Sequence, residues 1–278
     1  MLFMPRVQTL ATRKAREPLA PPTTDTDRDF GVAISRAFDV LRCYSPTRPL
    51  LGISELSRLT GLPKATIARL TYTLASLGYL YRVLPAGKYR LGWGILSLGY
   101  PLLTGMALRQ VARPAMHALA MHIRANVNLG TLDRLNVIYV ESVRFDESSA
   151  ARSEIGACHP VLKSSIGRAI VAGMDAASGQ RLLNQLRLAD EQAFQTAKQQ
   201  LDKTRRDLAS KGYCASDSDV YPGYVTIAAA MRVPMHEEPL AFNCAMPTTQ
   251  FRKSQIERDI GPRLVGMVRQ IESRLGYT

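Results

Sequence analysis

Apolar residues recur at three- and four-residue intervals in the stretch from residue 64 to residue 77, which predicts a helix with one buried face. These residues are Ile67, Leu70, Leu74 and Leu77. A shorter helix is expected just before it, over residues 55–59, with Ser54 as the N-cap. Gly61 lies between the two and supplies the permissive backbone of a tight turn. The pattern therefore predicts two short helices joined by a glycine turn.

A short hairpin is expected directly after these helices. Pro63 stands where the second helix begins, and Gly78 stands where it ends. Residues 79–84 and 88–91 flank the turn Pro85-Ala86-Gly87 and are expected to form two strands. Helix, turn, helix and a two-stranded wing are the parts of a winged helix-turn-helix, which places its second helix in the major groove of DNA.

The rest of the chain alternates irregularly between helical and strand patterns, which favours an α+β domain. We expect interruptions of a helical connector near Pro101 and Gly105 and a break or kink at Pro114. Residues 145–154 are polar and are expected to form a loop. The predicted helices are 30–44, 94–126 with these interruptions, 164–172, 178–188, 191–210 with Gly212 as its cap, and 254–275. The predicted strands are 127–132, 137–143, 224–233 and 240–245.

Positive charge is concentrated in the half of the chain that holds the helix-turn-helix pattern. The whole chain carries 36 Lys and Arg against 23 Asp and Glu, a formal net charge of +13. Residues 1–110 contain 15 of these bases and only 6 of the acids, so they hold most of the excess. Such an asymmetry indicates attraction to a polyanion such as DNA.

Cysteine spacing and hydropathy exclude several classes of protein. The four cysteines are scattered and form no CxxC pair, so neither a zinc ribbon nor a disulfide framework is expected. Reduced thiols fit a cytoplasmic protein. No stretch approaches the roughly 20 apolar residues that a membrane span needs. Residues 1–29 are first basic and then rich in Pro, Thr and Asp, which fits a disordered extension better than an organellar transit peptide.

Three stretches together resemble the IclR family of bacterial transcription regulators. GLPKATIARLTYTLASLGYL followed by KYRLG resembles the family's DNA-binding domain. HPVLKSSIGRAIVAGM and LASKGYCASDSDVYPGYVTIAAAM resemble two later segments in the same order. The resemblance covers residues 31–277. It implies a winged helix-turn-helix at 30–92, a linker helix at 93–112 and a larger α+β, GAF-like effector-binding domain at 113–278.

The start of the second predicted helix carries the candidate base-contacting residues. Arg69 and Thr66 are expected to contact base edges, because Arg binds guanine in bidentate fashion and Thr contacts bases or thymine methyl groups. Lys64 is expected to contact a phosphate, with Ala65 beside it. Arg82, Lys88 and Arg90 on the wing are expected to hold the DNA backbone or the adjacent minor groove. The alternative is that these charges form an ordinary solvated face.

The resemblance implies a small organic effector in the second domain. By position it assigns effector contact to Ser165, Ile166, Asp219, Thr226, Asn243 and Ala245. Backbone N–H groups at the 164–167 helix start would suit a carboxylate, so an organic acid is expected. For Ser164 and Ser165 simple N-capping is the alternative. The chain departs from the family at Asp219, where Glu is usual, and at Ala229-Ala230-Met231, where Ala-Pro-Val is common. These departures concern which ligand binds.

No catalytic or metal-binding pattern is evident, and no cofactor is expected. Cys158 and His159 are adjacent, so in extended chain they point to opposite faces and cannot act as nucleophile and base for one another. His117 and His122 are five residues apart, whereas two helical metal ligands need a four-residue spacing. We therefore predict that the protein is not an enzyme.

The leading hypothesis is a transcription regulator that binds operator DNA as a homodimer or dimer of dimers and responds to an effector. The apolar connector 94–123 is a candidate interface, unless it is a helix buried in its own domain. Three alternatives stay open: a ligand-free oligomerisation domain joined to the DNA-binding domain, an enzyme with an appended DNA-binding domain, and an architectural protein that binds DNA without sequence preference.

Overall fold

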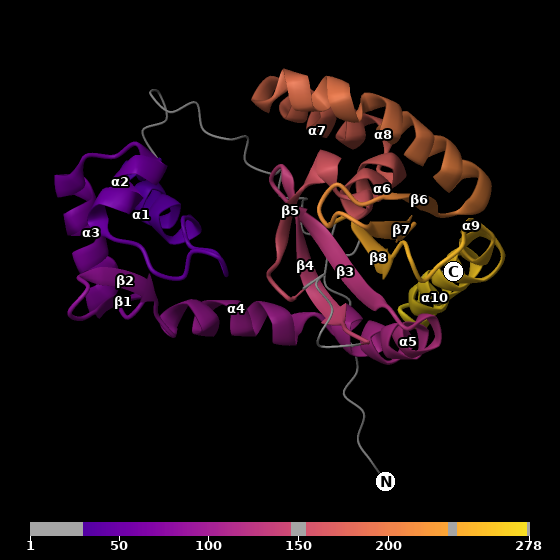
Figure 1. The fold of residues 1–278 in the computed structure, drawn as a ribbon, viewed down its shortest axis with the longest axis horizontal. Helices are drawn as coiled ribbons and strands as arrows, with labels where there is room; N and C mark the ends of the chain where they lie inside the picture. The colour runs from indigo at the N-terminus through magenta and orange to yellow at the C-terminus, as the bar shows by residue number, and fades with distance from the viewer. Residues whose placement is uncertain (1–29, 146–153, 233–237, 277–278) are drawn as a thin grey trace, which may run out of the picture. The chain divides into compact units, whose positions relative to one another are not determined.

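The computed structural model describes residues 30–145, 154–232 and 238–276 (Figure 1). Contacts divide the chain into two compact units, Met1–Tyr100 and Pro101–Thr278. The predicted N-terminal extension, 1–29, lies outside the described residues, as does most of the predicted loop 145–154.

The first unit is a three-helix winged helix-turn-helix, as predicted. Its core is a single cluster to which every element contributes, including Val40, Leu56, Ile67, Leu80 and Tyr89. A backbone bridge pairs Leu51 with Tyr89, so the segment before the second helix lies against the wing. Its elements are α1 (Val32–Arg42), α2 (Ile53–Thr60), α3 (Lys64–Ser76), β1 (Leu80–Val83) and β2 (Lys88–Leu91).

Two local predictions in this unit are wrong. The N-cap of α2 is Gly52 rather than Ser54, because the Glu55 carboxylate accepts a 2.8 Å hydrogen bond from the Gly52 N–H and replaces a hydroxyl cap. Leu77 is 62% exposed instead of buried, since α3 ends at Ser76 and the chain turns away. Thr71 takes an inner position, and its hydroxyl donates to the Ile67 carbonyl.

The turn between α2 and α3 forms where the glycine was expected. Gly61 ends α2 in the left-handed region with φ 72°, a conformation that costs glycine little and other residues more. α3 then starts one residue after its N-cap, Pro63.

The connector is two helices, α4 (Gly94–Gly105) and α5 (Ala107–Ile123), with the break at Met106. α4 runs through Pro101 and α5 through Pro114, so no break occurs at either proline, and the interruption expected near Gly105 falls at Met106. Pro114 itself is exposed, while Ala112 and Met116 on either side of it are buried. α5 packs on the second unit's sheet, whereas no residue of α4 is buried.

The second unit is built on one six-stranded antiparallel sheet, which confirms the predicted α+β class. The strand order is β5-β4-β3-β8-β7-β6. Sequence patterns missed β5 and β6, which are only three and four residues long and lie at the two edges. The strands are β3 (Asn126–Asp133), β4 (Asn136–Val143), β5 (Cys158–Pro160), β6 (Cys214–Asp217), β7 (Tyr224–Ala230) and β8 (Leu240–Pro247).

Helices cover both faces of this sheet (Figure 1). α5 and α10 (Gly261–Arg274) pack on one face, and α6 (Ser165–Gly173) packs on the other with α8 (Glu191–Lys211) and α7 (Ala176–Ala189) around it. Alternation along β8 sends Phe242 and Cys244 into the α5/α10 core and Ala241 into the α6 core. Asn243 therefore faces α6.

The closing helix is interrupted, which differs from the single helix predicted over 254–275. A short α9 (Lys253–Gln255) leads into a π-helical turn, Ile256–Ile260, before α10 begins. Ile256 and Ile260 are both buried, so the π turn serves to bring both side chains into the core.

Candidate DNA-binding surface and effector cluster

The start of α3 presents its polar side to solvent. Lys64, Ala65 and Arg69 are exposed and Thr66 is partly buried, while Ile67 is completely buried on the opposite side. The buried side anchors α3 to α1 and α2. The four residues predicted to contact DNA thus lie together on the first two turns of an anchored helix.

The three predicted wing cations have different surroundings. Arg82 is exposed. Lys88 lies 3.1 Å from the Glu55 carboxylate of α2. The Gly52 N–H and then Lys88 lower the pKa of Glu55. Lys88 therefore links the wing to α2 through an exposed ion pair. Arg90 lies over the Tyr81 ring, 4.8 Å from its centroid, and 5.9 Å from the centroid of the Trp93 ring.

The two serines at the start of α6 differ in their contacts. Ser164 is the N-cap, and its hydroxyl accepts a 3.1 Å hydrogen bond from the Gly167 N–H. The Ser165 hydroxyl is buried without a hydrogen-bond partner in the part of the chain that the structure describes. The capping alternative therefore holds for Ser164 but leaves Ser165 available. Gly167 permits the tight turn, because a Cβ there would lie 2.3 Å from the Val161 carbonyl oxygen.

A line of buried polar side chains crosses the sheet on its α6 face. The Ser142 hydroxyl donates to the Asn128 amide oxygen at 2.8 Å, and the Asn128 amide donates to the Asn243 oxygen at 3.0 Å. The Asn243 amide in turn lies 3.4 Å from the Tyr139 hydroxyl. Burial raises the pKa of Tyr139 to about 12, against a lowering effect of Asn243. Sequence reasoning found Asn243 but missed Asn128 and Tyr139.

Asp219 is paired with a residue that sequence reasoning did not select. Arg168 of α6 is buried, and it donates to the Asp219 carboxylate at 3.3 Å, to the Leu162 carbonyl at 2.8 Å and to the Ser216 hydroxyl at 2.8 Å. Burial lowers the pKa of Arg168, and Asp219 opposes that effect. The Thr226 hydroxyl lies 3.3 Å from the Ser216 carbonyl oxygen. Arg168 thus joins α6 to the segment that carries Asp219.

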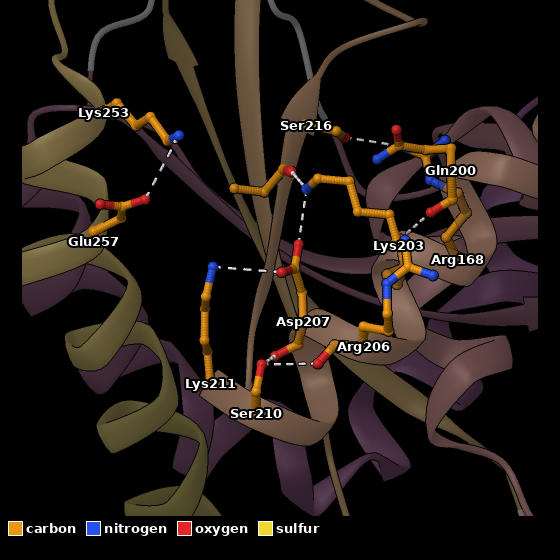
Figure 2. A network of polar contacts seen from close by, with 12 residues as sticks. Arg168, Gln200, Lys203, Arg206, Asp207, Ser210, Lys211, Ser216, Lys253 and Glu257 are labelled. Carbon is orange, nitrogen blue, oxygen red and sulfur yellow. Dashed lines mark hydrogen bonds and ion pairs between the residues drawn. The ribbon is translucent and has the colours of Figure 1, made fainter.

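A second set of charges lies along α8 near Ser216, as Figure 2 shows, and one of its members also bonds to the sheet edge. Lys203 donates to Asp207 at 2.8 Å and to the Ala215 carbonyl at 3.0 Å, and Lys211 lies 3.4 Å from Asp207. Burial acts to raise the pKa of Asp207, but the two lysines lower it overall. The two ion pairs lie within α8, and the Lys203 bond to the Ala215 carbonyl links this helix to the edge strand β6.

Four aromatic side chains of the second unit contact one another in sequence: Tyr139, His159, Tyr221 and Tyr224. His159 lies edge-on to Tyr139 with ring centroids 5.2 Å apart, and to Tyr221 at 5.9 Å. Tyr221 contacts Tyr224 at 6.2 Å. Burial lowers the pKa of His159, and among the described residues its Nε2 is buried without a partner. Burial also raises the pKa of the neighbouring Cys158 thiol.

The predicted effector residues fall into three groups. Ser165, Ile166, Thr226 and Asn243 are buried in the α6 side of the unit. Asp219 borders a hollow of about 730 Å³ between α6, α8 and β6. Ala245 borders another of about 730 Å³ at the end of the sheet, together with Asn126, Tyr224 and Arg124. The structure thus does not bring all six into one open cavity.

No metal site or membrane helix is found within residues 30–145, 154–232 and 238–276. Nowhere in these ranges do three or more His, Cys, Asp or Glu side chains gather as metal ligands would. His122 instead lies 3.2 Å from Asp259. No helix there is both long and apolar enough to cross a bilayer.

A winged helix-turn-helix followed by a sheet domain with a buried polar cluster defines a DNA-binding transcription regulator with a C-terminal effector domain. The family model for the IclR helix-turn-helix domain matches residues 33–84. The model for the bacterial transcriptional regulator IclR C-terminal domain matches residues 101–273, more than half of the chain. The chain belongs to the IclR family.

Similar proteins share nearly the whole chain. The HTH-type transcriptional regulator TsaQ1/TsaQ2 of Comamonas testosteroni is 30% identical over 246 residues, which are 87% of this chain and 88% of that protein. The crystal structure of an IclR family transcriptional regulator from Brucella abortus is 37% identical, covers 92% of this chain and 96% of its own, and has a TM-score of 0.81. An IclR homolog from Microbacterium hydrocarbonoxydans, crystallised with 4-hydroxybenzoate, shares the fold with a TM-score of 0.65 at 21% identity, over 88% of this chain and all of its own (100%).

Proposed function

We propose that this protein binds operator DNA as a homodimer or dimer of dimers and releases or retains it in response to a small organic carboxylate. In this proposal residues 30–92 bind DNA, 93–112 link, and 113–278 bind the effector. The single observation that carries it is the cluster of the exposed Lys64 and Arg69 with the partly buried Thr66, at the start of a helix whose other side is anchored.

The surroundings of each side chain on α3 and the wing suggest which part of the DNA it contacts. Arg69 and Thr66 read bases in the major groove, with Ala65 close enough for apolar contact, and Lys64 contacts a phosphate. Arg82 and Arg90 extend from the wing to the backbone or minor groove. Lys88 contributes to DNA binding mainly by fixing the wing through Glu55, although its positive charge adds to the field that attracts DNA.

The effector is proposed to bind on the α6 face, among Ser165, Ile166, Thr226 and Asn243; Asp219 and Ala245, which border two separate hollows, are the outlying members of the predicted set. Three groups there have unused hydrogen-bonding capacity among the described residues: the Ser165 hydroxyl, the His159 Nε2 and the Arg168 Nε. Leaving polar atoms unpaired in a protein interior costs free energy, so a ligand that pairs them is favoured. The 4-hydroxybenzoate complex of the Microbacterium hydrocarbonoxydans homolog supports a carboxylate as the class of ligand to test first.

Self-association is proposed to use α4. Leu96, Leu98, Tyr100 and Leu102 are all more than half exposed, and α4 buries none of its residues within the chain. A helix that is apolar and uncovered in the monomer is expected to be covered in the assembly.

DNA binding is tested by gel shift and footprinting of the intergenic DNA upstream of the protein's own gene, with competitor DNA at several salt concentrations. A protected site that survives competition supports a regulator. Equal affinity for every duplex, with steep salt dependence, would support the architectural alternative instead.

Effector binding is tested by calorimetry and thermal shift with 4-hydroxybenzoate and a series of short aliphatic carboxylates. The two adjacent serines provide a matched pair of variants. Ser165→Ala is expected to weaken the best ligand about five- to tenfold by removing one hydrogen bond. Ser164→Ala is expected to lower thermal stability through loss of the cap while changing ligand affinity less. A protein that binds none of these carboxylates would favour the ligand-free oligomerisation domain.

A further inference from the structure

The wing holds one arginine between two aromatic rings. Tyr81 of β1 and Arg90 of β2 are directly opposed in the hairpin register, so both side chains lie on the same face. The Arg90 guanidinium lies 4.8 Å from the Tyr81 ring centroid and 5.9 Å from the Trp93 ring centroid. Trp93 is the second residue after the end of β2. One of its nitrogens also donates to the Leu91 carbonyl at 3.2 Å.

This arrangement lies on the surface rather than in the core. Trp93 is 69% exposed and Tyr81 is 38% exposed, and Arg90 is exposed as well. A single exposed ring needs no explanation, but here two exposed rings lie close to the same exposed cation. The first unit already has a complete core that includes neither ring.

Stacking changes what Arg90 can do. A free arginine loses much of its rotamer entropy when it binds, but a guanidinium held by two rings has already lost part of it. The Tyr81 ring, 4.8 Å from the guanidinium, also lies against part of its surface, so somewhat less water must be removed there when it enters a groove. Its edge still carries N–H donors, and the positive charge is unchanged.

We propose that Tyr81 and Trp93 are positioning residues that hold Arg90 for insertion into the DNA minor groove beside the major-groove site of α3. The inference rests on the proposed DNA binding and deepens it by naming what the wing recognises. A narrow, A·T-rich minor groove has an enhanced negative potential that attracts arginine, and it lacks the guanine amino group that would block the guanidinium. The wing therefore selects sites with A·T pairs next to the major-groove contacts.

Arg82 provides the matched control within the same hairpin. It is an exposed arginine one residue from Tyr81, but its cross-strand partner is the buried Tyr89. Arg82 is expected to contact phosphate, which carries no sequence information. The two arginines thus have the same charge and lie in neighbouring cross-strand pairs on opposite faces of the hairpin, and only the Arg90 face carries the exposed rings of Tyr81 and Trp93.

The test uses the full chain and a duplex recovered from random DNA by selection with the wild-type protein. Three versions of its flanks are compared, with A·T pairs, with G·C pairs and with inosine·cytosine pairs. Inosine lacks the minor-groove amino group of guanine but keeps the major-groove acceptors of a G·C pair. Minor-groove reading predicts that the inosine and A·T flanks bind alike and that G·C flanks bind on the order of tenfold more weakly.

Variants then assign this preference to residues. Arg90→Gln is expected to remove the flank preference, and Trp93→Leu and Tyr81→Leu to reduce it with Arg90 in place. Trp93→Phe is expected to restore most of it, because a ring is retained. Arg82→Gln is expected to weaken binding to all three flanks equally.

The position of Trp93 gives an independent readout. It is the only tryptophan of the chain, so its fluorescence reports on this site alone. Binding of the A·T-flanked duplex is expected to change its emission and shield it from acrylamide, and Arg90→Gln is expected to diminish both effects. If G·C and inosine flanks bind alike, or if Trp93→Leu keeps the full flank preference, the positioning role is overturned while DNA binding stands. If no duplex can be selected, the proposed function itself fails.

Discussion

Lys88 of the wing and Glu55 of α2 form an ion pair with a nitrogen–oxygen distance of 3.1 Å. The same carboxylate accepts the hydrogen bond from the Gly52 N–H that caps α2. One glutamate therefore joins the first helix of the helix-turn-helix to the second strand of the wing. Lys88, which the sequence pattern assigns to DNA contact, therefore also takes part in an ion pair within the folded domain.

Stability of the first unit is expected to depend on the charge of Glu55. Its pKa in the folded protein is lowered, by the Gly52 N–H first and by Lys88 second, from an ordinary value of 4.5. A lowered folded pKa means that the stabilisation is complete above the unfolded pKa and is lost as pH falls through the folded value. Wild-type protein should thus lose more stability than Glu55→Gln between about pH 5 and about pH 3.

Urea denaturation followed by the fluorescence of Trp93 measures this effect in the first unit. Glu55→Ala serves as the comparison, since it removes the cap as well as the charge and should be less stable than Glu55→Gln at neutral pH. Parallel losses of stability in the wild type and in Glu55→Gln across the acid range would contradict the prediction.

Arg69→Ala is expected to weaken specific operator binding by about 1–3 kcal/mol and to leave the fold intact. Arg69 is exposed on α3, so its removal leaves no cavity. Gel shifts with the selected duplex measure the loss. Arg206→Ala, an exposed arginine on α8, is the control and should bind as the wild type does. Unchanged affinity of Arg69→Ala would remove this residue from the reading surface.

Asn243 should be important for stability as well as for any ligand. Asn243→Leu leaves the buried Asn128 amide without its acceptor, which is expected to cost about 1–3 kcal/mol. Tyr139→Phe should cost less, because the contact it removes is long, at 3.4 Å. Calorimetric unfolding of both variants checks the order, and a Tyr139→Phe loss equal to or larger than that of Asn243→Leu would show that the polar line is held together differently.

Substitutions on α4 are expected to change the oligomeric state. Leu96→Asp and Leu102→Asp place a charge on a helix that buries nothing within its own chain, so the fold should survive and self-association should weaken. Light scattering coupled to size-exclusion chromatography measures the mass. Leu188→Asp, on the 84% exposed Leu188 of α7, is the control. A mass unaffected by the α4 variants would place the interface elsewhere.

Much of the winged helix-turn-helix could be predicted from the local pattern of glycines and apolar residues. Gly61 marks the helix-turn-helix turn because few residues other than glycine tolerate its left-handed backbone. Ile67 and Leu74 identify the inner side of α3 because their spacing matches the helical repeat. The local pattern was weakest at element ends. Leu77 fits the same repeat but lies beyond the last turn, and Glu55 capped α2 from inside the helix where Ser54 was expected.

Contacts between distant residues had no such signal. The Arg168–Asp219 pair joins residues 51 positions apart, and the Asn128–Asn243 pair joins residues 115 apart. Periodicity describes neighbours along one element, whereas these pairs exist only because α6 packs on the sheet and β3 lies beside β8. For the same reason Ser164 and Ser165 look equivalent in the sequence, yet one is a cap and the other a buried hydroxyl.

The sequence by itself determined the winged helix-turn-helix, the α+β class of the second domain and the family, because each depends on spacing, turns and ordered motifs. Tertiary structure decided how each candidate side chain is engaged. It paired Lys88 with Glu55 and Asp219 with Arg168, and it placed Arg90 near the rings of Tyr81 and Trp93. The physical reason is that hydrogen bonds, ion pairs and ring contacts act over a few ångströms, and only the folded chain decides which residues come that close.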